Sequence, residues 1–484
     1  MEIKLEKQDW IFFLLCLLVG VLAEESFFRG QIGISYFVFI IVFYSVFFWR
    51  FRLFSLSNQR LGYLVLIIIW ILAACYALYD MTLFYGMNIL VIPGLVIFHL
   101  ALSTSPKNLN GSQLSFFVCM IIRIADSIRY NAFFTKHLST MFKGKHGNKH
   151  FAVGTKILIG ILISVPFLFI ILNLLIEADT QFERLISSIP HLLSFRVEYI
   201  FRVAIILIYT FGFFGYQQVL LKKDFQIMKP IQWRGVAIDG IITLTVLVLL
   251  DLVYILFVAV QFTYFFSGTL EAGYTYAEYA RRGFFELLFV TLINLSVTTA
   301  VITLTKHTHG FLKNSIRSAL TILVLSSGVL LVSAFMRMSM YEEAYGFTFT
   351  RVLVHSFMIF LFVIFAYTLV KIWLERLSLF HFYFIAALIY YAGMNVINMD
   401  EIVVDRNIAR FEKTEKIDIY YLNELSSTGT LGLIKLYEKN PQIPGLKELL
   451  QQRKAESEYS HISSWQSYNL TRDRVHEKLG ELDL

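Results

Sequence analysis

Apolar residues fill this chain in blocks of about twenty, and short charged stretches separate the blocks. A helix of about twenty residues crosses roughly 30 Å of hydrocarbon, which is the thickness of a bilayer core. Because hydrocarbon offers the backbone no hydrogen-bond partner, each block is predicted to be helical. The pattern therefore predicts an all-α protein, a polytopic transmembrane helix bundle of about 11 spans.

The predicted spans follow one another along the first 396 residues. They are 10–23, 32–49, 61–79, 83–102, 153–176, 199–221, 236–266, 284–304, 319–335, 352–370 and 377–396. A secretory signal peptide is the alternative for Trp10–Ala23, because Lys4 and Lys7 precede a short apolar core. Cleavage there would leave the later spans unchanged. Residues 337–350, between the ninth and tenth spans, are predicted to form a polar turn.

One long segment, Leu114–Phe142, alternates apolar and charged residues at helical spacing. Arg123, Asp126, Arg129 and Lys136 make it too polar to cross a bilayer comfortably. We predict an amphipathic helix that lies along the membrane surface. The basic run that follows it favours the anionic cytoplasmic leaflet.

The last part of the chain, residues 397–484, has a different composition. Apolar residues recur there at helical spacing, and long apolar runs are few. We predict short helices at 400–414, 418–425, 430–438, 445–456 and 463–482, broken by Gly429, Pro441 and Pro444. Two domains follow from this: a membrane bundle over residues 1–396 and a small all-helical extramembrane module over residues 397–484.

Composition excludes a soluble protein. Hydrophobic residues make up 57% of the 484 positions and charged residues 16%, whereas a soluble domain carries about 25% charged residues. All three cysteines lie in apolar stretches, so the sequence contains no disulfide framework and no metal-ligand spacing of cysteines.

The net charge of +7 is distributed in a way that predicts orientation. Alternate connections that include the N-terminus carry about 21 Lys and Arg, against seven in the opposite short loops. This bias predicts a cytoplasmic N-terminus, and an odd number of spans then puts the C-terminus outside the cytoplasm. Because the positive charge follows the loops in this way, we expect no nucleic-acid partner.

Polar groups gather at the predicted outer mouth of the eighth span, in Tyr274–Leu287. Glu278, Arg282 and Glu286 are spaced at i,i+4, which predicts two ion pairs along one helix stripe. One interpretation is an interfacial helix whose tyrosines belong to the aromatic belt. The other is a site for an anion or a lipid headgroup, because Arg281 and Arg282 offer planar forks to phosphate or carboxylate.

Further polar residues are predicted on the same side of the membrane, where together they would line an outer vestibule. The candidate vestibule residues are Tyr276, Glu278, Tyr279, Arg281, Arg282, Glu286, Glu343, Asp400, Arg406 and Arg410. Loops on one side of a bundle always share that side. Only proximity in the structure would make these residues a site.

Asp251 is the candidate site residue within the membrane. It lies mid-span, where a carboxylate costs several kcal/mol unless it is paired or hydrated. One interpretation is a role in proton or cation movement, and the other is a structural hydrogen bond between helices. His355 and His381 are single histidines in apolar runs, and we predict that they hydrogen-bond within the core.

The sequence lacks the patterns typical of catalysis or of a bound cofactor. It contains no Walker loop, nucleophile elbow, His-Glu-x-x-His motif or dinucleotide fingerprint. His307 and His309 lie without carboxylate or cysteine neighbours, so they predict no metal site. We expect no cofactor and no metal, and the sequence favours a protein that is not an enzyme.

Three phrases of the sequence resemble a known family. They are Tyr276-Ala-Glu-Tyr-Ala-Arg-Arg-Gly-Phe-Phe-Glu-Leu, Glu343-Ala-Tyr-Gly, and Asp400-x4-Asp405-Arg406-Asn407-x2-Arg410. Over nearly its whole length the chain resembles the bacterial domain-of-unknown-function 4173 family and its sister family 4153. It departs from that pattern at Glu401, where an alanine-like residue would follow the aspartate. The resemblance implies a bacterial, multi-pass protein of the inner or plasma membrane with an outside tail, and it supplies no catalytic residue.

Two functions remain open on these grounds. The first is transport, or the handling of a lipid or anion, through an outward-facing vestibule that leads toward Asp251, with membrane lipid as a partner. The second is a non-enzymatic scaffold or envelope sensor that binds a protein partner through residues 397–484. A membrane enzyme acting on a lipid-linked sugar is a third reading, for which the sequence marks no nucleophile or metal.

Overall fold

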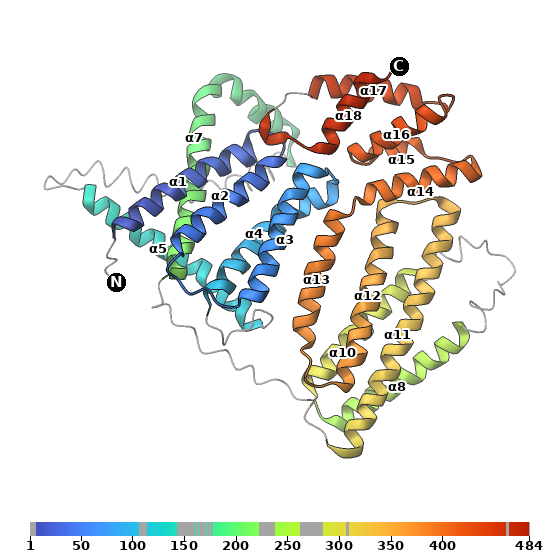
Figure 1. Cartoon of the computed structure of the whole chain (residues 1–484). Coiled ribbons are helices and arrows are strands. Elements are labelled where there is room, and N and C mark those ends of the chain that lie inside the picture. Colours follow the sequence, from blue (N-terminus) through green and yellow to red (C-terminus); the bar gives the residue numbers. More distant parts are fainter. Residues whose placement is uncertain are drawn as a thin grey trace. The chain divides into compact units, whose positions relative to one another are not determined.

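The computed structural model of the chain divides into two compact units, and Figure 1 shows its helices. The structure describes residues 6–105, 114–142, 160, 164, 171, 175, 178–221, 238–261, 284–305, 309–460 and 464–483. The first unit comprises Met1–Tyr79, Met87–Pro230 and Ile462–Leu470, and the second comprises Asp80–Gly86, Ile231–His461 and Thr471–Leu484. The described residues form helices and no β-strand, which confirms the all-α prediction.

The long helices of the first unit come from the N-terminal half of the chain. They are α1 (Lys7–Phe28), α2 (Ile34–Arg50), α3 (Gln59–Leu78), most of α4 (Thr82–Thr104), α5 (Leu114–Phe142) and α7 (Thr180–Leu221). α1 packs along α2 and α7, and α5 packs along α7. Aromatic rings fill these contacts, since Phe12, Phe134 and Phe214 are each at most 1% exposed. In hydrocarbon, close packing of this kind holds helices together.

The second unit contains a bundle built around one long helix. Its members are α8 (Gly240–Val260), α10 (Phe284–Leu304), α11 (Gly310–Tyr345), α12 (Phe349–Trp373) and α13 (Leu379–Val396). α11, labelled in yellow in Figure 1, packs against α8, α10 and α12. It ends at Gly346, whose φ of +84° is a conformation that only glycine adopts readily. The tight turn that follows returns the chain into α12.

The remaining helices of the second unit are short. They are α14 (Met399–Thr414), α15 (Ile419–Glu424), α16 (Ser427–Lys439), α17 (Leu446–Ser460) and α18 (Leu470–Glu481). They share an apolar cluster of their own, in which Val404, Leu433 and Leu450 are at most 4% exposed. This small core lies within the sequence range expected for the C-terminal module. The proposed division of the whole chain at residue 396 stays a prediction.

In the described part of the chain, nine helices are long and apolar enough to cross a membrane. α2 is a shorter apolar helix, and α5 is not among the nine, although its bounds agree with the predicted amphipathic helix. These spans make the protein an integral membrane protein. The predicted span 153–176 falls mostly outside the described residues, so the total of about 11 spans stays a prediction.

Several predicted boundaries are wrong. α11 begins at Gly310 rather than at residue 319, and α16 begins at Ser427 and continues through Gly429, which was predicted to break the helices. Residues 337–345 are helical rather than part of a turn, because Arg337 and Glu342 lie buried on the inner face of α11. The last predicted helix begins at Leu470 instead of residue 463. The residues before it belong to the first unit, where the carbonyl of Tyr468 accepts from the amide of Ile34 (3.0 Å) and the side chain of Asn469 donates to the carbonyl of Tyr76 (2.9 Å).

Candidate functional site

α8 buries three polar side chains on one face, which extends to Gln261 just after its end. Thr243, Asp251 and Gln261 are buried, whereas most of the other side chains of α8 are apolar and exposed. This buried face packs against α11. Asp251 lies at the middle of the 21-residue helix and is 5% exposed. A carboxylate is thereby held inside the helix bundle at mid-span.

Two polar contacts fix the register between α8 and α10. Near one end the hydroxyls of Thr243 and Thr305 lie 3.4 Å apart. Farther along, the side chain of Asn294 interacts with the hydroxyl of Tyr254. Eleven residues separate Thr243 from Tyr254 along α8, and eleven residues separate Asn294 from Thr305 at the end of α10. The contacts pair the start of one interval with the end of the other. The two helices are therefore antiparallel and in register along this interval.

This register brings Asp251 to the level of Thr298. Asp251 lies three residues from Tyr254, or about 4.5 Å along the axis, and Thr298 lies four residues from Asn294, or about 6 Å, in the same direction. Thr298 is fully buried, as is Asn294 at 1% exposed. Counted along the helix axes, the three side chains lie within about 6 Å of one level, on the buried faces of two helices that each pack against α11.

Each of these three residues has a buried oxygen that lacks a hydrogen-bond partner among the described residues. The atoms are Oδ1 of Asp251, Oδ1 of Asn294 and Oγ1 of Thr298. The amide nitrogen of Asn294 is used, since it donates to Oγ of Ser327 on α11 at 2.9 Å. That bond holds the amide in place and leaves its oxygen free. A carboxylate, an amide carbonyl and a hydroxyl are the oxygen donors that hard cations prefer.

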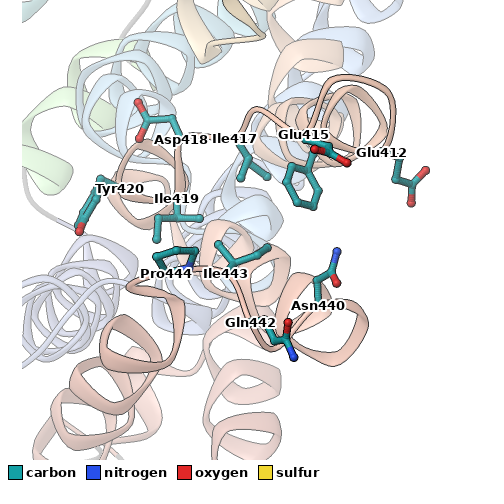
Figure 2. Close-up of a pocket in the computed structure, with 11 residues that line it drawn as sticks. Glu412, Glu415, Ile417, Asp418, Ile419, Tyr420, Asn440, Gln442, Ile443 and Pro444 are labelled. Atoms are coloured by element: carbon teal, nitrogen blue, oxygen red, sulfur yellow. The ribbon is translucent and has the colours of Figure 1, made fainter.

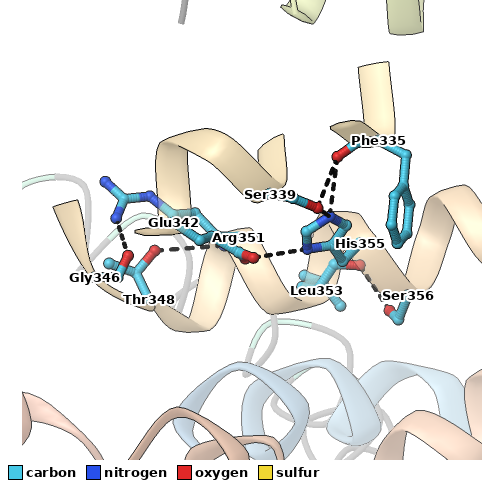
Figure 3. Close-up of polar contacts among 9 residues, drawn as sticks. All are labelled: Phe335, Ser339, Glu342, Gly346, Thr348, Arg351, Leu353, His355 and Ser356. Atoms are coloured by element: carbon cyan, nitrogen blue, oxygen red, sulfur yellow. Dashed lines mark hydrogen bonds and ion pairs between the residues drawn. The ribbon is translucent and has the colours of Figure 1, made fainter. Parts of the chain in front are cut away.

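Polar groups continue along the bundle from this cluster toward the end of α11. Oγ of Ser333 donates to Oε1 of Gln261 at 2.8 Å. Beyond it, Nδ1 of His355 lies 3.0 Å from Oε2 of Glu342, and Nε2 lies 3.3 Å from Oγ of Ser339 (Figure 3). Glu342 is 4% exposed, and its Oε1 also lacks a hydrogen-bond partner among the described residues.

The buried charges on α11 lie at a distance from Asp251. Arg337 is ten residues beyond Ser327, which is about 15 Å along the helix axis. Ser327 shares its level with Asn294, so Arg337 lies farther still from the level of Asp251. Among the described residues, no basic side chain pairs with Asp251. The polar groups around it are neutral.

A second candidate site is a hollow on the surface of the C-terminal helices. It encloses about 870 Å³ between the end of α14, the start of α15 and the turn after α16. Figure 2 shows Glu412, Glu415 and Asp418 along its edge, with Ile417, Ile443 and Pro444 forming an apolar floor. An apolar floor with an acidic edge suits a segment that carries both apolar and basic side chains.

A family model described as "Domain of unknown function (DUF4153)" matches residues 66–436. The chain belongs to this family. The match includes α8, α10, α11 and α12 in full, so the polar cluster around Asp251 lies within the DUF4153 region. The sister family 4173, which the sequence also resembles, is not shown by this match. Neither the curated proteins nor the solved structures contain a protein that matches the chain.

The structure describes half of the predicted vestibule residues. Tyr276, Glu278, Tyr279, Arg281 and Arg282 lie outside the described residues. Glu286 is exposed in the first turn of α10, and Glu343 and Arg406 are exposed as well. Whether these side chains line one vestibule therefore stays a prediction.

The two other predicted vestibule residues make hydrogen bonds of their own. Arg410 donates to the carbonyls of Glu343 (3.2 Å) and Ala344 (2.8 Å), and so satisfies backbone acceptors at the end of α11. Asp400 is buried and accepts a hydrogen bond from the hydroxyl of Ser426. Burial raises the pKa of the Asp400 carboxyl, against the lowering effect of that bond. Both residues stabilise contacts within the second unit.

Sequence reasoning selected Asp251 but missed the neutral residues around it. Thr291, Asn294 and Thr298 recur at steps of three and four along an otherwise apolar span, which is the spacing of one helix face. Ser326, Ser333 and Arg337 recur at steps of seven and four along α11, which also places them on one face. A search for polar residues in phase within each span would have found this face. It would not have shown which helices meet.

Proposed function

We propose that this DUF4153 protein is a membrane transporter in which Asp251 binds a monovalent cation, either Na⁺ or a proton. The observation that carries the proposal is the buried carboxylate at mid-span, whose Oδ1 lacks a hydrogen-bond partner among the described residues. An ionisable side chain at this depth costs several kcal/mol unless it is compensated. A bound cation compensates the charge, which gives a reason for placing an aspartate there.

The neighbours of Asp251 support this chemistry. Asn294 and Thr298 offer an amide oxygen and a hydroxyl oxygen on α10, and with the carboxylate these would form a set of three hard donors. With Na⁺ all three oxygens would be ligands. With a proton, Asp251 alone would take it up, and the neutral oxygens would accept its hydrogen bond.

The polar groups beyond the cluster supply a route. These groups follow one another from the level of Asn294 toward the end of α11. They are Gln261 with Ser333 and then Glu342 with His355. In the orientation predicted by the loop charges, with a cytoplasmic N-terminus and an extracytoplasmic C-terminus, that end faces outward. The predicted vestibule, with Glu286 and Glu343, would then be the outer entrance, and a bacterial plasma membrane is the expected location.

The test is a flux measurement on the full chain reconstituted in sealed vesicles of phosphatidylethanolamine and phosphatidylglycerol. We expect the wild type to take up ²²Na⁺ or to collapse a pH gradient followed with an internal pH dye. Asp251→Asn is expected to lower the rate at least tenfold. Asp239→Asn is the matched control, since Asp239 caps the same helix from its exposed end and asparagine caps equally well.

Flux that is equal in the wild type and in Asp251→Asn would overturn the proposal. The two probes separate the two cations: ²²Na⁺ uptake without a proton signal assigns Na⁺, and the reverse assigns the proton. Absence of both signals in the wild type also contradicts the proposal, because the carboxylate would then bind no transported cation.

A second candidate function is a scaffold that binds a partner through the C-terminal helices. The hollow between α14, α15 and the turn after α16 favours it, because Glu415 and Asp418 border an apolar floor there, whereas Glu412 is already paired with Lys439. We infer that the partner would insert an apolar side chain next to a lysine or arginine. Replacing Glu415 and Asp418 by lysine should then abolish cross-linking from Gln442→Cys to envelope proteins, while the exposed control Glu448→Lys should not.

A further inference from the structure

The first unit contains a second cavity, separate from the polar cluster of α8 and α10. It has a volume of about 640 Å³ and lies between α1, α2, α4, α5 and α7. Apolar and aromatic side chains form most of its wall, among them Tyr36, Phe39, Ile92 and Phe213. A cavity of this size matches those that bind small organic ligands, typically about 300–1,000 Å³.

The cavity is long and narrow relative to the helices that line it. Its wall follows α4 from Ile89 to Leu100 and α7 from Ile208 to Gln217. Eleven helical steps on α4 correspond to about 16 Å, and nine on α7 to about 13 Å. The space therefore follows the direction of the spans over about half the thickness of a bilayer core.

One end of the cavity is polar, and two of its side-chain oxygens lack hydrogen-bond partners among the described residues. Gln217 is 1% exposed and lines the cavity, yet its Oε1 lacks a hydrogen-bond partner among the described residues. Oδ1 of Asn131 on α5 also lacks a hydrogen-bond partner among the described residues, whereas its Nδ2 donates to the carbonyl of Phe211 at 2.8 Å. Two buried acceptors without donors cost about 1–3 kcal/mol each, which a ligand carrying N–H or O–H groups would recover.

The polar end lies near the end of a candidate membrane span, where a lipid headgroup would be expected. Gln217 is four residues from the end of α7 at Leu221, or about 6 Å along the axis, and residues 201–221 are a candidate span. The opposite end, at Phe27, Phe28 and Ile32, is apolar. An amphipathic ligand would thus place its headgroup near the end of α7 and its chain along the apolar wall that α4 and α7 form.

The entrance to the cavity is also apolar. Four of its lining residues, Phe28, Ile89, Ile124 and Ile128, are between 38% and 69% exposed. A water-soluble ligand would gain nothing at such an entrance, whereas an acyl chain can enter sideways from the bilayer. The apolar entrance favours a membrane lipid over a polar solute as the ligand.

We propose that the first unit binds one membrane lipid, whose acyl chain fills the cavity between α2, α4 and α7 and whose N–H- or O–H-bearing headgroup donates to Gln217 and Asn131. The proposal concerns the first unit only and does not depend on cation transport by the second. It assigns headgroup selection to two amide oxygens: phosphoethanolamine and phosphoglycerol headgroups carry donors, whereas phosphocholine carries none.

The experiment uses the full chain in vesicles that contain a lipid with a photoreactive diazirine on its acyl chain. We expect cross-links to Phe39, Ile92 or Phe213 after illumination, mapped by mass spectrometry. Labelling with the phosphoethanolamine form should exceed labelling with the phosphocholine form at least fivefold. Gln217→Met, which removes one acceptor and keeps the side-chain length, should reduce that preference toward equality.

A matched pair of glycine substitutions tests the cavity itself. Gly212 lines the cavity, and a Cβ at this position meets no atom within 4 Å, so Gly212→Leu should fill the space without a clash and abolish labelling. Gly94 on α4 is equally open but does not line the cavity, so Gly94→Leu should label like the wild type.

Two results would overturn the proposal. One is equal labelling by the two headgroup forms in the wild type, which removes the role of Gln217 and Asn131. The other is an absence of cross-links at the cavity wall in the wild type, which leaves another occupant, such as the chain's own apolar run 153–176. If Gly212→Leu does not fold, the headgroup comparison with Gln217→Met still decides the question.

Discussion

Buried carboxylates occur in both units of this protein, but their surroundings differ. In the first unit Asp9 lies 2.5 Å from the guanidinium of Arg50, and Gln218 donates to the same carboxylate oxygen at 2.9 Å. Glu24 is 2% exposed and has two arginines near it, each at 3.6 Å. In the second unit Asp251 is buried to a similar degree, and no described side chain supplies a positive charge or donates to its Oδ1.

This difference separates a structural role from a functional one. A carboxylate that is paired within the chain already has its compensation, and its removal leaves the partner uncompensated. A carboxylate without a partner contributes nothing to folding in its charged form, so its presence needs another explanation. The same residue type thus leads to opposite expectations in the two units for stability and for activity.

Loss of the pair in the first unit is expected to have the largest effect on stability. Arg50→Met leaves the partly buried Asp9 without its guanidinium, which should cost about 3 kcal/mol, the lower end of the range for a buried pair, because both side chains are 12% exposed. Thermal unfolding of the purified full chain in detergent measures it. Arg52→Met is the control, because Arg52 is exposed and should change the unfolding midpoint very little. A midpoint for Arg50→Met that equals this control would show that the pair is not structural.

An intermediate effect is expected at the pair between α11 and α12. His355→Leu removes the partner of Glu342 and should lower stability by about 1–3 kcal/mol, because a buried acceptor is left without its bond. His381→Leu is the same substitution at an exposed position on α13. Equal unfolding midpoints for the two variants would argue that Glu342 does not need His355.

A smaller, pH-dependent effect is expected at Asp400. Burial raises the pKa of this carboxyl above the ordinary value of about 3.9, so the folded state holds the proton more tightly than the unfolded state. Its stabilising contribution is present below the ordinary pKa and is lost as the pH rises through the raised pKa. Asp400→Asn resembles the protonated form, so this variant keeps the stabilising contribution as the pH rises.

The unfolding midpoint of Asp400→Asn, relative to the wild type, should therefore be higher at pH 7.5 than at pH 4. Asp405→Asn on the same helix is the control, because Asp405 is exposed beside Lys435. A relative midpoint that does not change with pH for Asp400→Asn would contradict the assigned burial effect.

The smallest effect on stability is expected where activity should change most. Asp251→Asn removes a charge that no side chain compensates, so the unfolding midpoint measured without Na⁺ should stay the same or rise. A loss of more than about 2 kcal/mol would place Asp251 with Asp9, as a residue that the fold requires.

The sequence predicted the helices well because their signal is local. Runs of apolar residues predicted the spans, and the spacing of charged residues predicted the bounds of α5. The turn expected at 337–350 was wrong because Arg337 and Glu342 look like loop residues until their burial is known. Contacts between helices determine whether such residues are buried, and the local sequence pattern does not contain these contacts.

The candidate site was predictable only in part for the same reason. Asp251 is conspicuous because it is a single charge in an apolar run. Asn294 and Thr298 are neutral, and their importance depends on the register between α8 and α10, which two distant contacts set. The cavity of the first unit depends on the shape of five packed helices, which no single stretch of sequence encodes.

Charge movement after an ion jump tests the central claim most directly. Vesicles containing the full chain are adsorbed to a sensor, and the current is recorded when the outer Na⁺ concentration or the pH is changed in one step. The account predicts a transient current for the wild type and for Asp239→Asn and none for Asp251→Asn. An undiminished current in Asp251→Asn, or no current in the wild type for either ion, would contradict it.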